Sequence, residues 1–177
     1  MSSRLRAPAM LLCATIPFLT AGCGYHVAGR TSSLPSNVKT IAVLAIENRT
    51  QHYRIEQRMT SALVHEFLTR ANYRIVSEAS GADAVLTGRI NSLESNAILF
   101  DAATGRATTM LVTVHCEVLL EDRQTKKALY RNDNFLFRNE YEVSTDLPSF
   151  FEEQDPALDR MARDFASRLV AAILENF

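Results

Sequence analysis

Residues 110–120 read MLVTVHCEVLL, and this stretch decides the fold. Six apolar side chains stand at every second position: Met110, Val112, Val114, Cys116, Val118 and Leu120. The positions between them include Thr113, His115 and Glu117. Successive side chains of a strand point to opposite faces of its sheet, so this alternation predicts an antiparallel strand with one face on the core and one face in water.

Other segments share this strand character. Residues 38–46, VKTIAVLAI, are apolar on both faces, which predicts a buried central strand. Residues 82–93 begin apolar and become polar, as an antiparallel strand does when it leaves the core, and residues 73–76 suggest a short strand. Residues 129–143 alternate again, with one apolar face made by Phe135, Phe137, Tyr141 and Val143. The connections at 100–109 and 122–127 are predicted to be polar loops.

Two segments have helical periodicity. Ile55, Met59, Leu63 and Phe67 recur every four residues, which predicts one apolar face of a helix that ends near Asn72. Asn48 and Gln51 resemble a capping box at its start. Asp155 and Pro156 predict the N-cap and first residue of a second helix. Its apolar stripe consists of Leu158, Met161, Phe165, Leu169, Ile173 and Phe177.

Each helix is apolar on one side only, and the later strands have one apolar face. These elements pack most simply as an α+β two-layer sandwich. We expect a mostly antiparallel four-stranded sheet with the two amphipathic helices packed on one face, formed by residues 38–177 as a single domain.

The N-terminal residues resemble an export signal. Arg4 and Arg6 precede an uncharged run over 7–20 that is too short to span a bilayer. The run ends in Thr20-Ala21-Gly22-Cys23, which resembles a bacterial lipobox. We therefore expect a signal peptide at 1–22, acyl chains on Cys23 and a tether over 23–37. The alternatives are an uncleaved signal anchor or a half-cystine. Gly24, where an Asp would retain a lipoprotein at the inner membrane, favours the outer membrane.

Neither a catalytic centre nor a metal site is expected. The His residues are scattered, and the sequence has no HxxxH or CxxC spacing. Cys116 is interpreted as a small buried hydrophobe, and we expect no cofactor other than the acyl chains. With a formal net charge of −1, the chain has no bulk attraction for nucleic acid. The cluster of Arg123, Lys126 and Lys127, with Arg131 nearby, fits either phosphate binding or a solvated turn.

Several segments in this order resemble the LPS-assembly lipoproteins of the LptE family. They are CGYH at 23–26, IAVLAIENRT at 41–50, ADAVLTGRI at 82–90, VTVHCEVLLED at 112–122 and the helix over 157–177. The resemblance implies a non-enzymatic outer-membrane lipoprotein on the periplasmic face. It implies a domain that plugs and helps assemble the LPS-translocating β-barrel LptD, and that binds lipopolysaccharide (LPS) through loop cations.

The sequence departs from this family at the loop over 100–109. Asp101 follows Phe100 where enterobacterial relatives carry a basic residue, so Arg106 becomes the LPS-contact candidate of this loop, beside Arg123, Lys126, Lys127 and Arg131. The stretch IAVLAIENRT also resembles CsgG-like and TolB N-terminal domains. The alternative function is therefore that of another outer-membrane lipoprotein, one acting in secretion or envelope structure.

Overall fold

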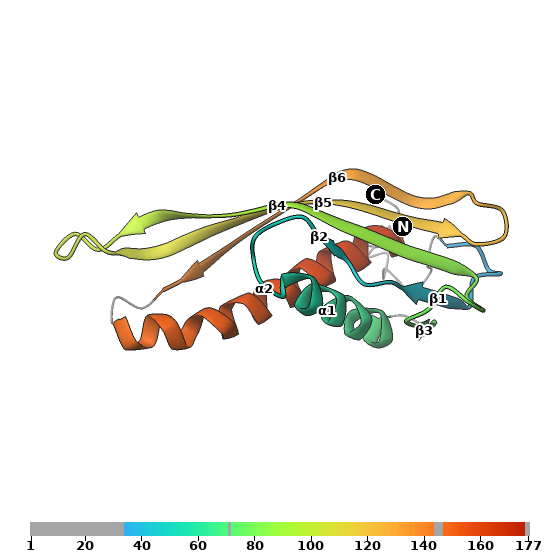
Figure 1. The fold of residues 1–177 in the computed structure, drawn as a ribbon, viewed down its shortest axis with the longest axis horizontal. Coiled ribbons are helices and arrows are strands. Elements are labelled where there is room, and N and C mark those ends of the chain that lie inside the picture. The colour runs from blue at the N-terminus through green and yellow to red at the C-terminus, as the bar shows by residue number, and fades with distance from the viewer. Residues whose placement is uncertain (1–33, 71, 144–146, 176–177) are drawn as a thin grey trace, which may run out of the picture.

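The computed structural model describes residues 34–70, 72–143 and 147–175, with only the backbone over 147–155. The elements follow one another as β1 (Thr40–Val43), β2 (Glu47–Asn48), α1 (Ile55–Arg70), β3 (Arg74–Val76), β4 (Ala84–Phe100), β5 (Ala107–Asp122), β6 (Ala128–Glu142) and α2 (Leu147–Glu175). Figure 1 shows an elongated α+β molecule with both helices on the same side of the sheet. The predicted signal peptide, Cys23 and most of the tether lie outside the described residues.

The sheet is mixed and has six strands, so the expected four-stranded antiparallel sheet is wrong in part. Its order is β3-β1-β4-β5-β6, and β2 pairs with β4 beside β1. β1 pairs in parallel with both β3 and β4, whereas β4, β5 and β6 form antiparallel hairpins. The parallel part follows from the chain connection, because α1 crosses from the end of β2 back to the start of β3 and so lays β3 parallel to β1.

The alternation of β5 is confirmed. Val112, Val114, Cys116, Val118 and Leu120 are all buried, and the residues between them are half-buried. β4 and β6 keep their apolar residues on the same face by means of bulges. In β4 the buried positions are even-numbered as far as Ile90, and the register shift around Asn91 moves them to odd numbers, so Leu93 also points inward.

The core lies between this sheet face and the two helices. The face predicted for the first helix is confirmed, since Ile55, Met59, Leu63 and Phe67 are all buried in α1. From α2, Phe165 is buried and meets two rings of β6 edge to face, Phe135 at 5.7 Å and Phe137 at 5.6 Å between centroids. These contacts hold the longer helix under the third antiparallel strand.

Both predicted helix starts are wrong. Asn48 lies in β2, and its side chain organises the following loop: Oδ1 accepts the Thr50 backbone N–H at 2.8 Å and Nδ2 donates to the His52 carbonyl at 2.9 Å. α2 begins at Leu147, so Pro156 lies inside the helix. A helical proline loses one backbone hydrogen bond, but its fixed φ remains compatible with a helix. The Asp155-Pro156 pair, although typical of a helix start, therefore does not prevent α2 from beginning at Leu147.

We predict that Phe165→Ala destabilises the protein by about 3–5 kcal/mol, because it removes a buried ring from between α2 and β6 and leaves a cavity. Leu68→Ala on the exposed side of α1 is the control, with an expected change within about 0.5 kcal/mol. Urea denaturation followed by far-ultraviolet circular dichroism measures both. Equal effects of the two substitutions would contradict the packing described for α2.

Candidate functional site

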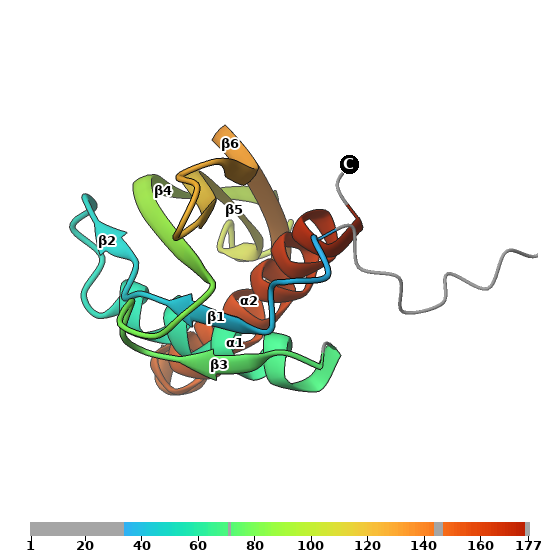
Figure 2. The same ribbon diagram turned by 90° about the vertical axis from the view of Figure 1, so that its right-hand side faces the viewer.

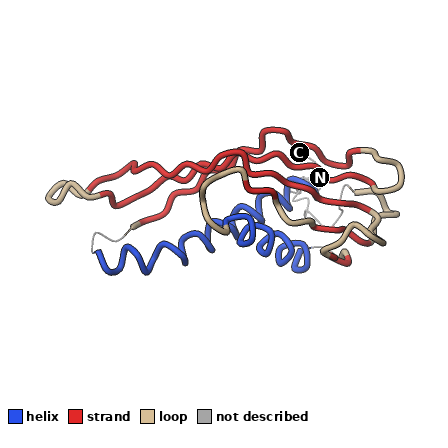
Figure 3. Tube along the Cα trace, in the orientation of Figure 1, coloured by secondary structure: helices blue, strands red, loops and turns tan. Residues whose placement is uncertain are grey.

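The β4–β5 hairpin extends beyond the rest of the sheet. β6 ends at Glu142, which pairs with Thr109, so the last part of the hairpin has no third strand beside it. Figure 3 shows this two-stranded projection at one end of the molecule. Its flank exposes three large apolar side chains, namely Ile98, Leu99 and Phe100, the last being 61% exposed. Exposed apolar side chains at a projecting tip make it a candidate interaction site.

The turn that closes this hairpin is held by Asp101. Its Oδ1 accepts the backbone N–H of Thr104 at 2.7 Å, the Thr104 hydroxyl at 2.6 Å and the N–H of Ala103 at 3.2 Å. The Thr104 side chain and backbone hold the pKa of this carboxyl below its usual range. Gly105 takes a φ of +66°, where glycine carries no steric penalty. The acid that departs from the enterobacterial pattern therefore forms the turn itself.

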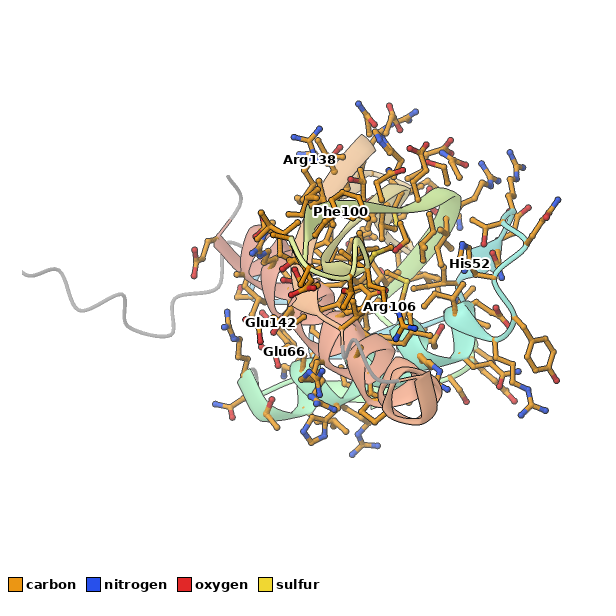
Figure 4. All side chains as sticks on the ribbon, turned by 90° about the vertical axis from the view of Figure 1, so that its left-hand side faces the viewer. His52, Glu66, Phe100, Arg106, Arg138 and Glu142 are labelled. Atoms are coloured by element: carbon orange, nitrogen blue, oxygen red, sulfur yellow. The ribbon has the colours of Figure 1, made fainter. Side chains whose placement is uncertain are left out.

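Arg106 closes the tip turn. Its carbonyl accepts the Asp101 backbone N–H at 2.8 Å, and the residue is exposed. Figure 4 looks at the molecule from this end, with Phe100 and Arg106 near the middle of the view. The tip thus combines an apolar flank with one cation.

The predicted cluster of three cations lies at the opposite end of the sheet from Arg106. Arg123, Lys126 and Lys127 belong to the turn between β5 and β6, whereas Arg106 precedes β5. A strand rises about 3.4 Å per residue, so the length of β5 separates the two turns by roughly 50 Å. Figure 1 shows the two turns at opposite ends of the molecule. The structure therefore does not bring the predicted LPS-binding cations together, and one LPS headgroup cannot contact both sets.

Two of the four cation candidates near this end, Arg131 and Lys126, have acidic neighbours. Arg131 Nε lies 2.9 Å from Asp133 Oδ1, and Lys126 Nζ lies 3.2 Å from Glu121 Oε1. Both pairs are largely in solvent, where such contacts contribute little. Within the described part of the chain, the side chains of Arg123 and Lys127 have no ion-pair partner. Whether any of the four binds LPS stays a prediction.

A groove of about 500 Å³ lies between the two helices. It is open, and most of its lining residues are polar, among them Arg58, His65, Asp159 and Arg163. Arg58 of α1 forms an ion pair with Asp159 of α2 across it. This pairing joins the helices and leaves no convergent set of groups for a small ligand.

The described residues hold neither a metal-ligand cluster nor an ionised thiol. Those residues include no cluster of three or more His, Cys, Asp or Glu side chains suited to a metal ion. The Cys116 thiol is buried, and desolvation raises its pKa to about 12, so it stays protonated and unreactive at neutral pH. Neither helix in the described part of the chain is long and apolar enough to cross a bilayer.

Comparison with known proteins decides the family. The model of the family LptE, lipopolysaccharide-assembly, matches residues 38–173, which is most of the chain. The chain belongs to the LptE family. No curated protein sequence matches it.

Two solved structures share the fold, and a third is similar at a lower score. A protein from Xanthomonas campestris is 13% identical with a TM-score of 0.54, over 82% of this chain and 90% of that one. Uncharacterized lipoprotein B from Nitrosomonas europaea is 15% identical with a TM-score of 0.52, over 85% and 90%. Rare lipoprotein B from Shewanella oneidensis is 18% identical with a TM-score of 0.49, over 76% and 95%.

Sequence reasoning missed the apolar flank of the tip. It treated residues 100–109 as one polar loop, whereas the structure limits the turn to 101–106 and extends both strands into it. The available signal was the run AILF at 97–100, four apolar residues beside a turn. Only the tertiary structure shows that β6 ends at Glu142, with one further bond from the Val143 N–H to the Thr108 carbonyl, and that Leu99 and Phe100 are exposed.

The start of the described chain is fixed to the end of the sheet opposite the tip. Asp83 Oδ2 accepts the backbone N–H groups of Lys39 at 2.9 Å and Thr40 at 2.8 Å. Asp122 accepts the N–H of Thr125 at 2.8 Å and is also hydrogen-bonded by the Asn37 side chain. These bonds lower the pKa of both carboxyls, at Asp83 chiefly through Lys39 and at Asp122 chiefly through the Thr125 backbone.

We predict that acid weakens the fold through these two carboxylates. Because both folded-state pKa values are lowered, their contribution is complete above the unfolded value of about 3.9 and disappears as the pH falls through the folded values. Urea midpoints measured from about pH 6 to pH 2 should therefore fall below about pH 4. The pair Asp83→Asn and Asp122→Asn keeps the acceptor oxygens but cannot titrate, so its acid decline should be smaller; an unchanged decline would contradict the assignment.

Proposed function

We propose that this chain is an outer-membrane lipoprotein that plugs and assists assembly of the LptD β-barrel and binds LPS on its way to the outer leaflet. The match of the LptE family model over 38–173 carries the proposal. In this proposal Cys23 bears the acyl chains, residues 1–22 are removed, and the protein acts by binding, without catalysis.

The chemistry of the hairpin tip suits an amphiphile such as LPS. Leu99 and Phe100 offer apolar surface to acyl chains, and Arg106 offers a guanidinium to phosphate. Arginine forms strong, directional bonds to phosphate, and confinement in a barrel lumen strengthens them. The Asp101 carboxylate is engaged by Thr104 and the loop backbone, so it supports the turn and is not directed at the ligand.

The outer face of the sheet carries both charged and apolar side chains, which suits contact with the inner wall of a β-barrel. Arg89 bridges Glu47 and Glu117, each at 2.7 Å, and this network lies beside the exposed Leu136 of the third antiparallel strand. A face that is neither uniformly apolar nor uniformly charged fits the polar, water-accessible interior of a large barrel. The elongated shape in Figure 1 would let such a body lie along a barrel axis.

We predict that Arg106→Ala lowers LPS affinity about tenfold, since a charge-assisted bond to phosphate is worth about 1.5–3 kcal/mol. Phe100→Ala should weaken binding further by removing apolar contact. Titration of fluorescent LPS measures both. Arg131→Ala is the matched comparison, because it removes the competing arginine candidate near the opposite end of the sheet and should have the smaller effect. Equal losses for Arg106→Ala and Arg131→Ala would contradict a site at the tip.

We predict that the acylated protein, extracted in mild detergent, brings down an outer-membrane β-barrel much larger than itself. The reason is that a plug buries its sides against the barrel wall and should survive extraction. Size-exclusion chromatography with mass spectrometry of the peak identifies the partner. A lone monomer or a ring of this chain alone would contradict the proposal and favour the secretion-type alternative.

A further inference from the structure

Five cations gather at the end of the sheet opposite the tip. They are Lys39, Arg74, Arg123, Lys126 and Lys127, and all five residues are exposed. Lys39 and Arg74 stand at the starts of β1 and β3, and the other three stand in the β5–β6 turn. We call this set the basic edge. Figure 2 looks at the molecule from this end.

Backbone hydrogen bonds hold the basic edge together. The Arg74 N–H donates to the Lys39 carbonyl at 2.9 Å, and the Arg123 N–H donates to the Asp83 carbonyl at 2.9 Å. Asp83 in turn accepts the Lys39 N–H. The edge is therefore a fixed row across neighbouring strand ends, in contrast to cations scattered on separate loops.

The acids of this end do not cancel the row. Asp83 and Asp122 are engaged by backbone N–H groups of the edge itself. Glu121 contacts Lys126, whose side chain is 70% exposed. Glu78, in the loop between β3 and β4, is a fourth acid of this end and is exposed. Five cations thus stand against four carboxylates, two of which hold the fold, and the surplus is positive.

The two hairpin turns of the molecule have the same geometry but different sequences. DAATGR at 101–106 and DRQTKK at 122–127 both place an Asp carboxylate on the third backbone N–H after it and close with matching backbone bonds. The fifth residue is left-handed in both, with φ +66° at Gly105 and φ +58° at Lys126. Lysine bears a steric penalty there that glycine avoids, so the turn itself does not call for a lysine at 126.

The predicted anchor belongs to this end of the molecule. The first described residue, Leu34, is buried, and Asn37 is hydrogen-bonded to Asp122 of the basic turn. Cys23 precedes Leu34 by eleven residues, which span at most about 40 Å. The tip turn lies roughly 50 Å further along β5. An acylated Cys23 therefore holds the basic edge within about 40 Å of the lipid surface and sets no such limit on the tip.

We propose that the basic edge is a second membrane-attachment element, which binds the anionic phospholipid headgroups of the leaflet that holds the acyl chains. This inference rests on the proposed acylation of Cys23. Acyl chains fix the distance from the membrane, and a basic surface adds an electrostatic contact that fixes the orientation. The long axis then points away from the leaflet, with the apolar tip directed to the far end.

The test uses the acylated protein in vesicles and a polarity-sensitive dye. Gln124→Cys and Ala103→Cys place the dye at equivalent positions of the two matching turns. Cys116 is buried with its pKa raised to about 12, so it does not compete for the dye. We expect the dye at 124, but not at 103, to shift its emission when phosphatidylglycerol is added to phosphatidylcholine vesicles, and salt should reverse the shift.

Charge variants give the matched comparison. Each cation near an anionic surface is worth about fivefold in binding, so Arg123→Ala with Lys127→Ala should weaken the response ~25-fold. Arg160→Ala with Arg163→Ala removes two exposed cations from α2 and should leave it unchanged. Lys126→Gly should weaken the response while raising the unfolding midpoint, a combination that loss of structure does not produce.

The outcomes separate this inference from the proposed function. If the protein sediments with phosphatidylcholine vesicles and its Cys23→Ser variant does not, the anchor stands. If the emission of the dye at 124 then does not shift on addition of phosphatidylglycerol, only the membrane role of the basic edge is overturned. A dye at 124 that responds to LPS micelles but not to phosphatidylglycerol also overturns it and makes the turn an LPS site. If the unaltered protein does not sediment with vesicles, both the acylation of Cys23 and the membrane role of the basic edge are overturned.

Discussion

The strict alternation of β5 is the constraint on which the rest of the structure depends. Val112 to Leu120 bury every second side chain against α1 and α2, and a slip of one residue would expose the entire stripe. β4 and β6 must therefore present their apolar residues to the same side, and they do so through bulges at the points where their own patterns change phase. A long central strand with two long partners makes an elongated body.

The length of β5 separates the two candidate sites of the molecule, the hairpin tip and the basic edge. One turn closes the hairpin before β5 and another closes the hairpin after it, so the two lie at opposite ends of the molecule. The two turns are built alike, with an aspartate cap and a left-handed fifth residue. They differ in their surroundings, because the first has an uncovered apolar flank and the second has neighbouring cations. The same backbone device thus presents a tip with exposed apolar side chains at one end and a basic edge at the other.

The sequence predicted the faces of the elements better than their connections. The buried residues of α1 and β5 were those expected, because periodicity depends only on which side of an element meets the core. The helix starts at Asn48 and Pro156 were wrong. Asn48 was assigned to the helix although the β2–α1 loop uses its side chain, and Pro156 remained compatible with a helix that began earlier. The exposed apolar tip was missed because local sequence does not show where a neighbouring strand ends.

By itself the sequence determined the α+β class, the apolar faces and the resemblance to the LptE family. These depend on side-chain identity and spacing along the chain. Only the tertiary structure decided the parallel pairing of β1, the projection of the β4–β5 hairpin and the distance between Arg106 and the cations at 123–127. These depend on which segments pair and over what length, and such pairing is set by contacts between residues far apart in the chain.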